Sequence, residues 1–137
     1  MYHQLVALCY VHTHNYEEAV SHLQVVLNDI SNRQRQDTFL YSHMLNIIAH
    51  FELKNYQLLP YLIKSAKRFA DSRGFKQEVV ALFFKMFTEL TRKNSKQDKT
   101  RIFIEYGPKV IELNEINQES VLIGTLDLYK WMSERLQ

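Results

Sequence analysis

The chain has 137 residues, of which 46% are hydrophobic, and a formal net charge of +2. This length predicts one domain over residues 1–137, the composition excludes a disordered chain, and the mixed charges exclude the broad basic surface of a general nucleic-acid binder. With 3 Gly, 2 Pro and 1 Cys, the chain also lacks the residues that glycine-rich phosphate loops, turn-rich β folds and disulfide scaffolds require.

The first predicted element is a pair of short helices. Apolar residues at helical spacing predict a helix over Leu5–Val11 and a second over residues 16–27, with a polar turn at residues 12–15 between them. Asn15 is a suitable N-cap for the second helix, and Glu18 three residues later completes a capping box. Cys9 lies in the apolar stretch, where we expect it to pack as a small hydrophobic residue.

A longer helix and a fourth one follow the polar connection at residues 28–36. The longer helix is predicted to begin with Asp37 as its N-cap and to stop near Lys54. The fourth is predicted over Tyr56–Phe69, with Pro60 in its first turn, where a missing N–H group has little effect. Gly74 is a natural stop after this helix.

The last third of the chain alternates apolar helices with polar connections. We predict a strongly apolar helix over residues 75–90, a solvated segment at 92–99, and a helical segment over residues 100–106. Gly107-Pro108 then marks either a kink or a fresh helix start. A closing helix over residues 119–136 is expected to act as a cap, with Trp131 packed inward.

The turns recur at a fixed spacing. Asn15-Tyr16 is followed forty residues later by Asn55-Tyr56, and a period of this size is typical of helix-pair repeats. The same offset superimposes two sets of apolar residues, which we interpret as the inward positions of the second helix in each pair: Leu23, Ile63 and Phe103, and Val26, Ala66 and Tyr106.

The first pair resembles a tetratricopeptide repeat. The matching positions are Ala7, Tyr10, Tyr16, Ala19, Leu23 and Val26, while His14 stands where the family usually has Gly. The later pairs depart from the pattern, since Ile47 and Phe87 replace the small residue, His50 and Leu90 the aromatic, and Leu59 and Lys99 the second Ala. The bulk at residues 47 and 87 predicts wider helix pairs.

This resemblance implies an all-α fold, namely an α-α superhelix in the form of a right-handed solenoid of about three helix-turn-helix repeats with a C-terminal capping helix. It implies a scaffold that binds a protein or peptide on its concave face, where the family's geometry places Gln4, Tyr41, Met44, Ile48, Phe51, Phe84, Thr88 and Arg92. The alternative for each apolar member is a core position between repeats.

Two other functions stay open. One is a peptide-sensing regulatory domain of a larger transcriptional or signalling regulator, which flanking sequence would reveal; the other is a structural homo-oligomer. The helical pattern leaves no room for a cap before Tyr2, so we expect either a fragment of a longer protein or a homodimer formed through a terminal repeat.

Catalytic chemistry has no support in the sequence. No zinc-protease, nucleophile-elbow, Walker or dinucleotide motif is present, so we predict no enzyme, no cofactor and no small-molecule substrate. His12 and His14 are two residues apart at a turn and lack a matched set of ligands, which argues against a metal site. His43 and His50 share a helical face and are interpreted as histidines at the edge of the core.

A basic stretch runs along the fourth helix and its exit. Its members are Lys64, Lys67, Arg68, Arg73 and Lys76, offset locally by Asp71. A solvated helix face is the simplest interpretation, and contact with an acidic partner or nucleic acid is the sharper one. No apolar run is long enough to span a membrane, and the amino terminus lacks the layout of a signal peptide. We therefore expect a cytoplasmic protein without a membrane partner.

Overall fold

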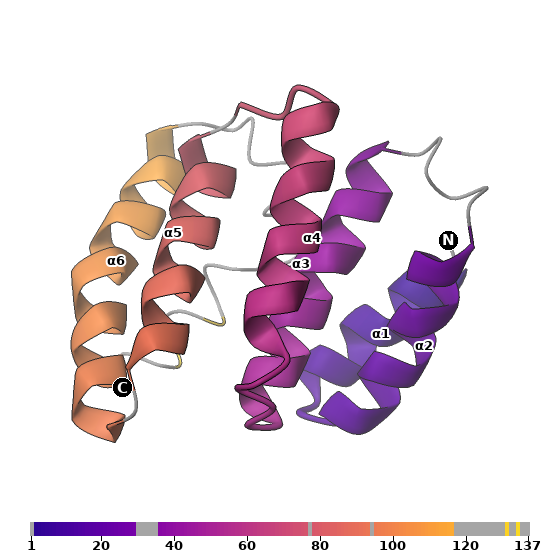
Figure 1. The fold of residues 1–137 in the computed structure, drawn as a ribbon, viewed down its shortest axis with the longest axis horizontal. Helices are drawn as coiled ribbons and strands as arrows, with labels where there is room; N and C mark the ends of the chain where they lie inside the picture. Colours follow the sequence, from indigo (N-terminus) through magenta and orange to yellow (C-terminus); the bar gives the residue numbers. More distant parts are fainter. Residues whose placement is uncertain are drawn as a thin grey trace. The chain divides into compact units, whose positions relative to one another are not determined.

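The computed structural model describes residues 2–29, 36–76, 78–93, 95–116, 131 and 134. Over these residues the chain forms 6 α-helices and no strand (Figure 1), which confirms the predicted all-α class. None of these helices is both long enough and apolar enough to cross a membrane. Most of the predicted closing helix over residues 119–136 lies outside the described residues.

The first compact unit, Met1–Gly74, holds four helices. They are α1 (Tyr2–His12), α2 (Tyr16–Asn28), α3 (Gln36–Glu52) and α4 (Leu59–Ser72). Consecutive helices pack on one another, and α1 also touches α3. Figure 1 shows the indigo pair α1 and α2 beside α3, with α4 on the other side of α3. The unit is therefore built from two helix hairpins joined through α2 and α3.

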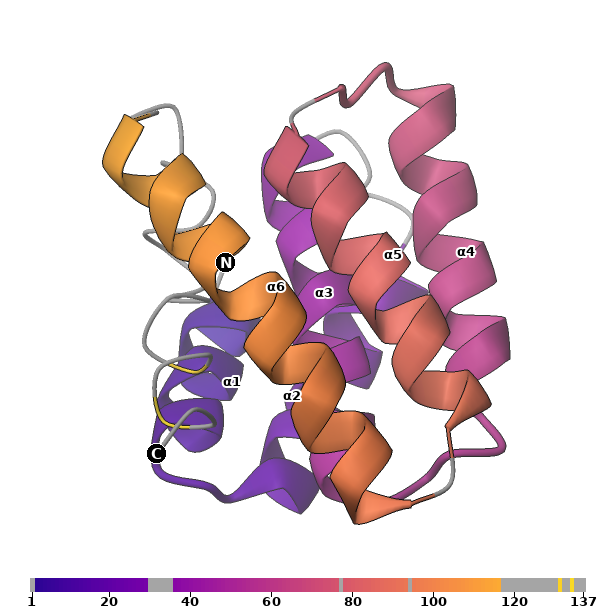
Figure 2. The ribbon, with the colours of Figure 1, turned by 90° about the vertical axis from the view of Figure 1, so that its left-hand side faces the viewer.

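The second compact unit, Phe75–Gln137, contains α5 (Glu78–Arg92) and α6 (Lys96–Ile116), which pack on each other (Figure 2). The α6 helix continues through Pro108, so a fresh start at this residue, one of the two alternatives, is wrong. Proline removes one backbone donor, and the surrounding turns hold the helix together.

Trp131 packs inward, as the sequence predicts. Its ring is buried and stacks on Phe87 at a centroid distance of 5.7 Å. It meets Phe103 edge-on at 5.4 Å. Aromatic pairs in these arrangements contribute about 0.5–1.5 kcal/mol beyond the area they bury, so the three rings hold this unit together.

The helices α1 and α3 end in the same way. His14 and Lys54 both have a φ of 63°, in the left-handed region. After α1, the N–H of residue 15 donates to the carbonyl of residue 10 (2.8 Å), and the N–H of residue 14 donates to the carbonyl of residue 11 (3.2 Å). After α3, the N–H of residue 55 donates to the carbonyl of residue 50 (3.0 Å), and the N–H of residue 54 donates to the carbonyl of residue 51 (3.0 Å). These bonds define a Schellman motif, and its two copies lie forty residues apart.

Asn15 does not cap α2 with its side chain, so the predicted capping box is wrong. Its Nδ2 instead donates to Thr13 Oγ1 at 3.0 Å. The reason lies in the Schellman motif, because the Asn15 N–H is already bonded to the carbonyl of Tyr10. The hydrogen bonds that end α1 therefore fix the backbone of Asn15, and its side chain is not oriented to cap α2.

Three predicted helix starts are also corrected. The α4 helix begins at Leu59 and not at Tyr56, because Pro60 has no N–H to donate to the carbonyl of Tyr56. The α3 helix begins at Gln36, which places Asp37 inside the helix and not at its cap. The α5 helix begins at Glu78 rather than at residue 75. Gly74 follows α4 with a φ of 74°, as expected for a stop.

The inward positions predicted from the forty-residue offset are confirmed. All six side chains are buried: Leu23, Ile63 and Phe103, and Val26, Ala66 and Tyr106. Ala7 and Ile47, which the forty-residue offset aligns, are both fully buried at 0% exposure although one side chain is small and the other large. The positions aligned by the offset are therefore alike in burial, although their side chains differ in volume.

The α3 helix is covered along most of its length. Every side chain from Phe39 to Phe51 is buried except that of His43, which is half-buried. Helices that are covered all round belong to the interior of a protein. Three polar residues of this helix are also buried, namely Ser42, Asn46 and His50. Buried polar groups require hydrogen bonds, and two of the three have them. Ser42 Oγ donates to the Thr38 carbonyl at 2.9 Å, and His50 Nδ1 lies 3.0 Å from Asn55 Nδ2.

Candidate functional site

The predicted concave-face residues of the first unit are inside the structure. Gln4, Tyr41, Met44, Ile48 and Phe51 are all buried. The Gln4 amide donates from Nε2 to the Thr38 carbonyl at 3.3 Å, which ties α1 to the start of α3. The four apolar side chains occupy core positions, the alternative that the sequence also allows, and the polar Gln4 is buried with them. Their role in binding a partner stays a prediction.

The predicted residues of the second unit differ in exposure along α5. Phe84 is buried, Thr88 is half-buried and Arg92 is exposed. The Thr88 hydroxyl donates to the Phe84 carbonyl at 2.7 Å, one turn earlier in the same helix. Within this unit, the predicted site therefore reaches the surface toward the end of α5.

The outer side of α4 carries a continuous exposed surface of basic and aromatic character. Tyr61 is 74% exposed, and Lys64, Lys67 and Arg68 are exposed on the following turns. We call these four residues the α4 basic face. The opposite side of the helix is apolar and buried through Leu59, Ile63, Ala66 and Ala70. This segregation fixes which side of α4 faces the solvent.

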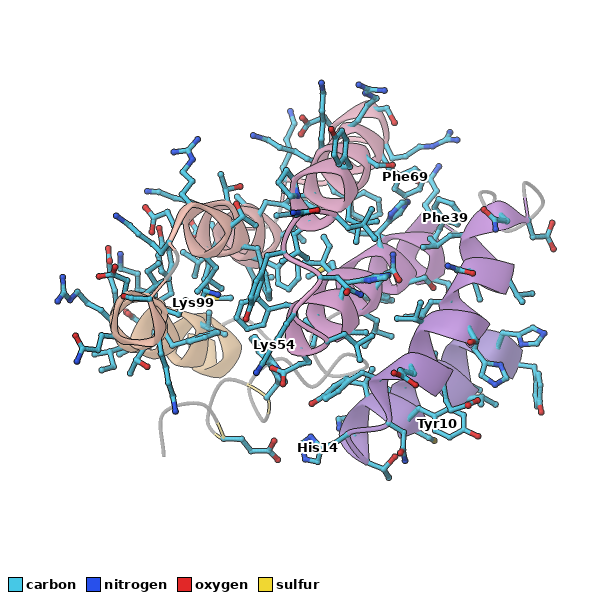
Figure 3. The ribbon with its side chains drawn as sticks, turned by 60° about the horizontal axis from the view of Figure 1, so that its bottom comes forward. Tyr10, His14, Phe39, Lys54, Phe69 and Lys99 are labelled. Carbon is cyan, nitrogen blue, oxygen red and sulfur yellow. The ribbon has the colours of Figure 1, made fainter. Side chains whose placement is uncertain are left out.

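The basic character continues past the end of α4. Arg73 and Lys76 are exposed, and the Arg73 guanidinium lies over the Phe69 ring at 5.6 Å from its centroid. Phe69 in turn packs on Phe39 of α3 at 4.8 Å, and Figure 3 shows these two rings together. A cation over an aromatic face is held electrostatically, so Arg73 has a defined position next to the face.

Most of the histidines behave as structural or turn residues. His12 and His14 are exposed, and His14 Nδ1 lies 2.8 Å from the Tyr16 hydroxyl at the turn between α1 and α2. His43 packs its ring against Phe69. Burial lowers the pKa of His50 from its usual 6.5, since a low dielectric disfavours the charged imidazolium. Both His43 and His50 thus lie at or inside the edge of the core, as predicted.

The structure brings together a third pair of histidines, which the sequence analysis does not predict. His3 of α1 and His22 of α2 are both half-buried, and their Nδ1 atoms are 2.9 Å apart. The signal was present in the sequence, because an antiparallel hairpin that turns near residue 13 brings together residues at equal distances on either side. The Tyr10 ring stacks on His22 at 5.7 Å. Figure 3 shows Tyr10 on this hairpin and His14 at its turn.

Cys9 is exposed, so the prediction that it packs as a hydrophobic residue is wrong. The buried side of α1 is formed by Gln4, Ala7 and Val11, at spacings of three and four residues. Cys9 lies two residues beyond Ala7, about 200° around the helix. Within the described residues no cluster of three or more His, Cys, Asp or Glu side chains is placed to hold a metal ion.

Comparison of the chain with protein-family models, curated proteins and solved structures finds no match. Function is therefore inferred from two features of the molecule itself. One is the repeated hairpin frame of the first unit, and the other is the segregation of exposed charge on α4.

Proposed function

We propose that this chain is a divergent tetratricopeptide-like module that binds another protein or a peptide. The observation that carries this proposal is the pair of identical Schellman motifs at the ends of α1 and α3, forty residues apart, with His14 and Lys54 both left-handed. A motif repeated at this spacing supports helix hairpins as the repeating unit. Hairpins stacked as a right-handed superhelix would form the arrangement that the family resemblance implies.

Helix-hairpin repeats favour binding because each hairpin uses one side for packing and leaves another exposed over its length. The α4 helix has this division, with a buried apolar side and the α4 basic face outside. Catalysis has no comparable support, since none of the catalytic motifs sought in the sequence is present. Holding a partner is thus the function that the geometry favours.

The surface that we assign to the partner is the α4 basic face, extended by Arg73 and Lys76. Cationic side chains around an exposed tyrosine suit an acidic segment, because the charges steer its approach and the ring offers an anchor. The side chains at the end of α5, Thr88 and Arg92, are the reachable members of the predicted concave-face set. The buried members would act by shaping the frame rather than by touching the partner.

The test is affinity capture from a native extract with two matched variants. The first reverses charges on the face with Lys64→Glu, Lys67→Glu and Arg68→Glu. The second reverses the same number of exposed charges on α6 and before it, with Lys93→Glu, Lys96→Glu and Arg101→Glu. Because all six side chains are exposed, helical content measured by circular dichroism should not change in either variant.

We expect the parent and the α6 variant to retain the same specific partner and the α4 variant to lose it. Raising the salt from about 50 to about 300 mM should weaken capture, since screening acts strongly on exposed charges. Equal capture by both variants would show that the α4 basic face is not the binding surface. Absence of any partner above the level of a blank resin would contradict the proposal as a whole.

A further inference from the structure

The hairpin of α1 and α2 carries a second candidate site, formed by histidine side chains instead of the charged side chains of α4. His3 and His22 come from different helices, and their Nδ1 atoms converge to 2.9 Å. Their rings are tilted by 35°, with centroids 5.1 Å apart. Both side chains are half-buried, so their nitrogens are positioned by the protein and remain within reach of the solvent.

Aromatic rings hold this pair from both sides. Tyr10 stacks on His22 with an interplanar angle of 21°, and Tyr2 meets His3 edge-on at 5.2 Å. Such contacts restrict the rotation of the imidazoles. A site whose nitrogens are already oriented needs less rearrangement when it binds a cation.

The distance between the nitrogens suits a transition metal. At this distance one ring carries its proton on Nδ1 and donates it to the other Nδ1. When that ring instead carries its proton on Nε2, both Nδ1 atoms offer a lone pair, and a small rotation of the rings turns the two lone pairs toward one ion. Metal–imidazole bonds of about 2.0–2.1 Å span about 2.9 Å when they meet at a right angle and about 3.3 Å when they meet tetrahedrally. The observed separation matches the right angle, which tetragonal Cu²⁺ and Ni²⁺ prefer over Zn²⁺.

We propose that His3 and His22 bind a divalent transition cation of the Cu²⁺ class through their Nδ1 atoms. The described residues provide no third protein ligand for such an ion, so water completes the coordination and the ion exchanges readily. Binding would tie α1 to α2 and stabilise the hairpin by mass action. This site is independent of the partner surface on α4.

The experiment is titration of the chain with Cu²⁺, followed by electron paramagnetic resonance and calorimetry. The protein carries Cys9→Ser, because an exposed thiol would reduce Cu²⁺, and a short amino-terminal extension, because a terminal amino group close to His3 would bind Cu²⁺ by itself. His3→Gln and His22→Gln remove one ligand each. The matched controls are His12→Gln and His14→Gln, which remove exposed imidazoles from the same hairpin.

We expect a tetragonal signal with coupling to two nitrogens, a higher melting temperature with Cu²⁺, and affinities in the order Cu²⁺, Ni²⁺, Zn²⁺. Either ligand variant should lower the Cu²⁺ affinity at least about tenfold, and neither control should. In the protein with all its histidines present, Cu²⁺ below one equivalent should broaden the ring NMR signals of His3 and His22 before those of His12 and His14. This measurement does not depend on any histidine substitution. Parent-like affinity in His22→Gln, or first broadening at His12 and His14, would overturn the proposal.

Discussion

The two hairpins of the first unit have the same backbone geometry at their turns but differ in the burial of their first helices. The α1 and α3 helices end with the same hydrogen bonds and the same left-handed residue. Yet α1 leaves Tyr2, Leu5 and Cys9 exposed, whereas α3 is covered from Phe39 to Phe51 apart from the half-buried His43. Local backbone chemistry therefore sets the hairpin, and the side chains decide whether its first helix is a surface or a core element.

The largest effect should come from exchanging the residues that differ in volume at the aligned positions 7 and 47. Ile47→Ala should destabilise the first unit by about 2–5 kcal/mol, because the deleted side chain leaves a cavity. Ala7→Ile should destabilise by about 1–3 kcal/mol through overpacking. Urea denaturation followed by circular dichroism measures both. Leu5→Ala is the exposed control, and a neutral Ile47→Ala would show that the two positions are not equivalent.

The hairpin of α5 and α6 has Tyr106 at the position that the forty-residue offset aligns with Val26 and Ala66. Unlike those two side chains, Tyr106 carries a hydroxyl group. Its ring is buried, its hydroxyl bonds to Glu89, and burial together with that carboxylate raises its pKa to about 12. Tyr106→Phe should destabilise the second unit by about 1.5–3 kcal/mol, as measured in guanidinium, with Tyr61→Phe as the exposed control.

The raised pKa of Tyr106 also predicts a loss of stability in alkali. The folded chain keeps the phenol proton up to about pH 12, whereas the unfolded chain releases it near pH 10. Unfolding thus becomes easier as the pH rises above about 10. Tyrosinate absorbance should show a late-titrating group that is missing in Tyr106→Phe. An unchanged titration curve would contradict the assignment.

A smaller effect should distinguish His50, which replaces the aromatic Tyr10 of the first hairpin. Its pKa is lowered by burial from 6.5, so the folded state favours the neutral ring and the unfolded state takes up the proton first. Stability from this group is complete above about pH 6.5 and is lost as the pH falls below it. Unfolding curves between about pH 7.5 and about pH 5.5 should lose part of their pH dependence in His50→Gln relative to the parent.

The smallest effect concerns the two left-handed residues. Glycine adopts this conformation without strain, so Lys54→Gly should stabilise the chain by up to about 1 kcal/mol. His14→Gly should gain less, because it removes the bond from His14 to the Tyr16 hydroxyl. Thermal melts compare the two, and Lys54→Ala separates the loss of the charge from the relief of the backbone. A larger gain at His14 would show that its side chain adds nothing.

Much of the helical frame could be predicted, because helical periodicity and turn residues are local properties. The turns near residues 14 and 54 and the stop at Gly74 follow from the chain itself. The start of α4 could not be placed from the apolar pattern alone, since the decisive factor was the donor that Pro60 lacks. The capping role of Asn15 failed for a related reason, namely that two helix ends compete for one residue.

The candidate site was less predictable than the fold. A helix face can be recognised from spacing, but whether Tyr41 or Met44 is accessible depends on what packs over it. The exposed charges of α4 were identifiable, because a run of lysine and arginine is hard to bury. The His3–His22 pair follows from the antiparallel register of α1 and α2, which must be combined with the position of the turn before the two residues are seen to be neighbours.

The covered position of α3 determines which amide hydrogens are released last. In deuterated solvent, its backbone N–H groups should exchange only when the first unit opens as a whole, since no partial opening uncovers a helix enclosed on most sides. Amides on the outer side of α4 should exchange by local fraying. The slowly exchanging amides between residues 39 and 51 would therefore report the global opening of the first unit. A change in their exchange rate on adding a partner would measure how much binding at another surface stabilises this unit.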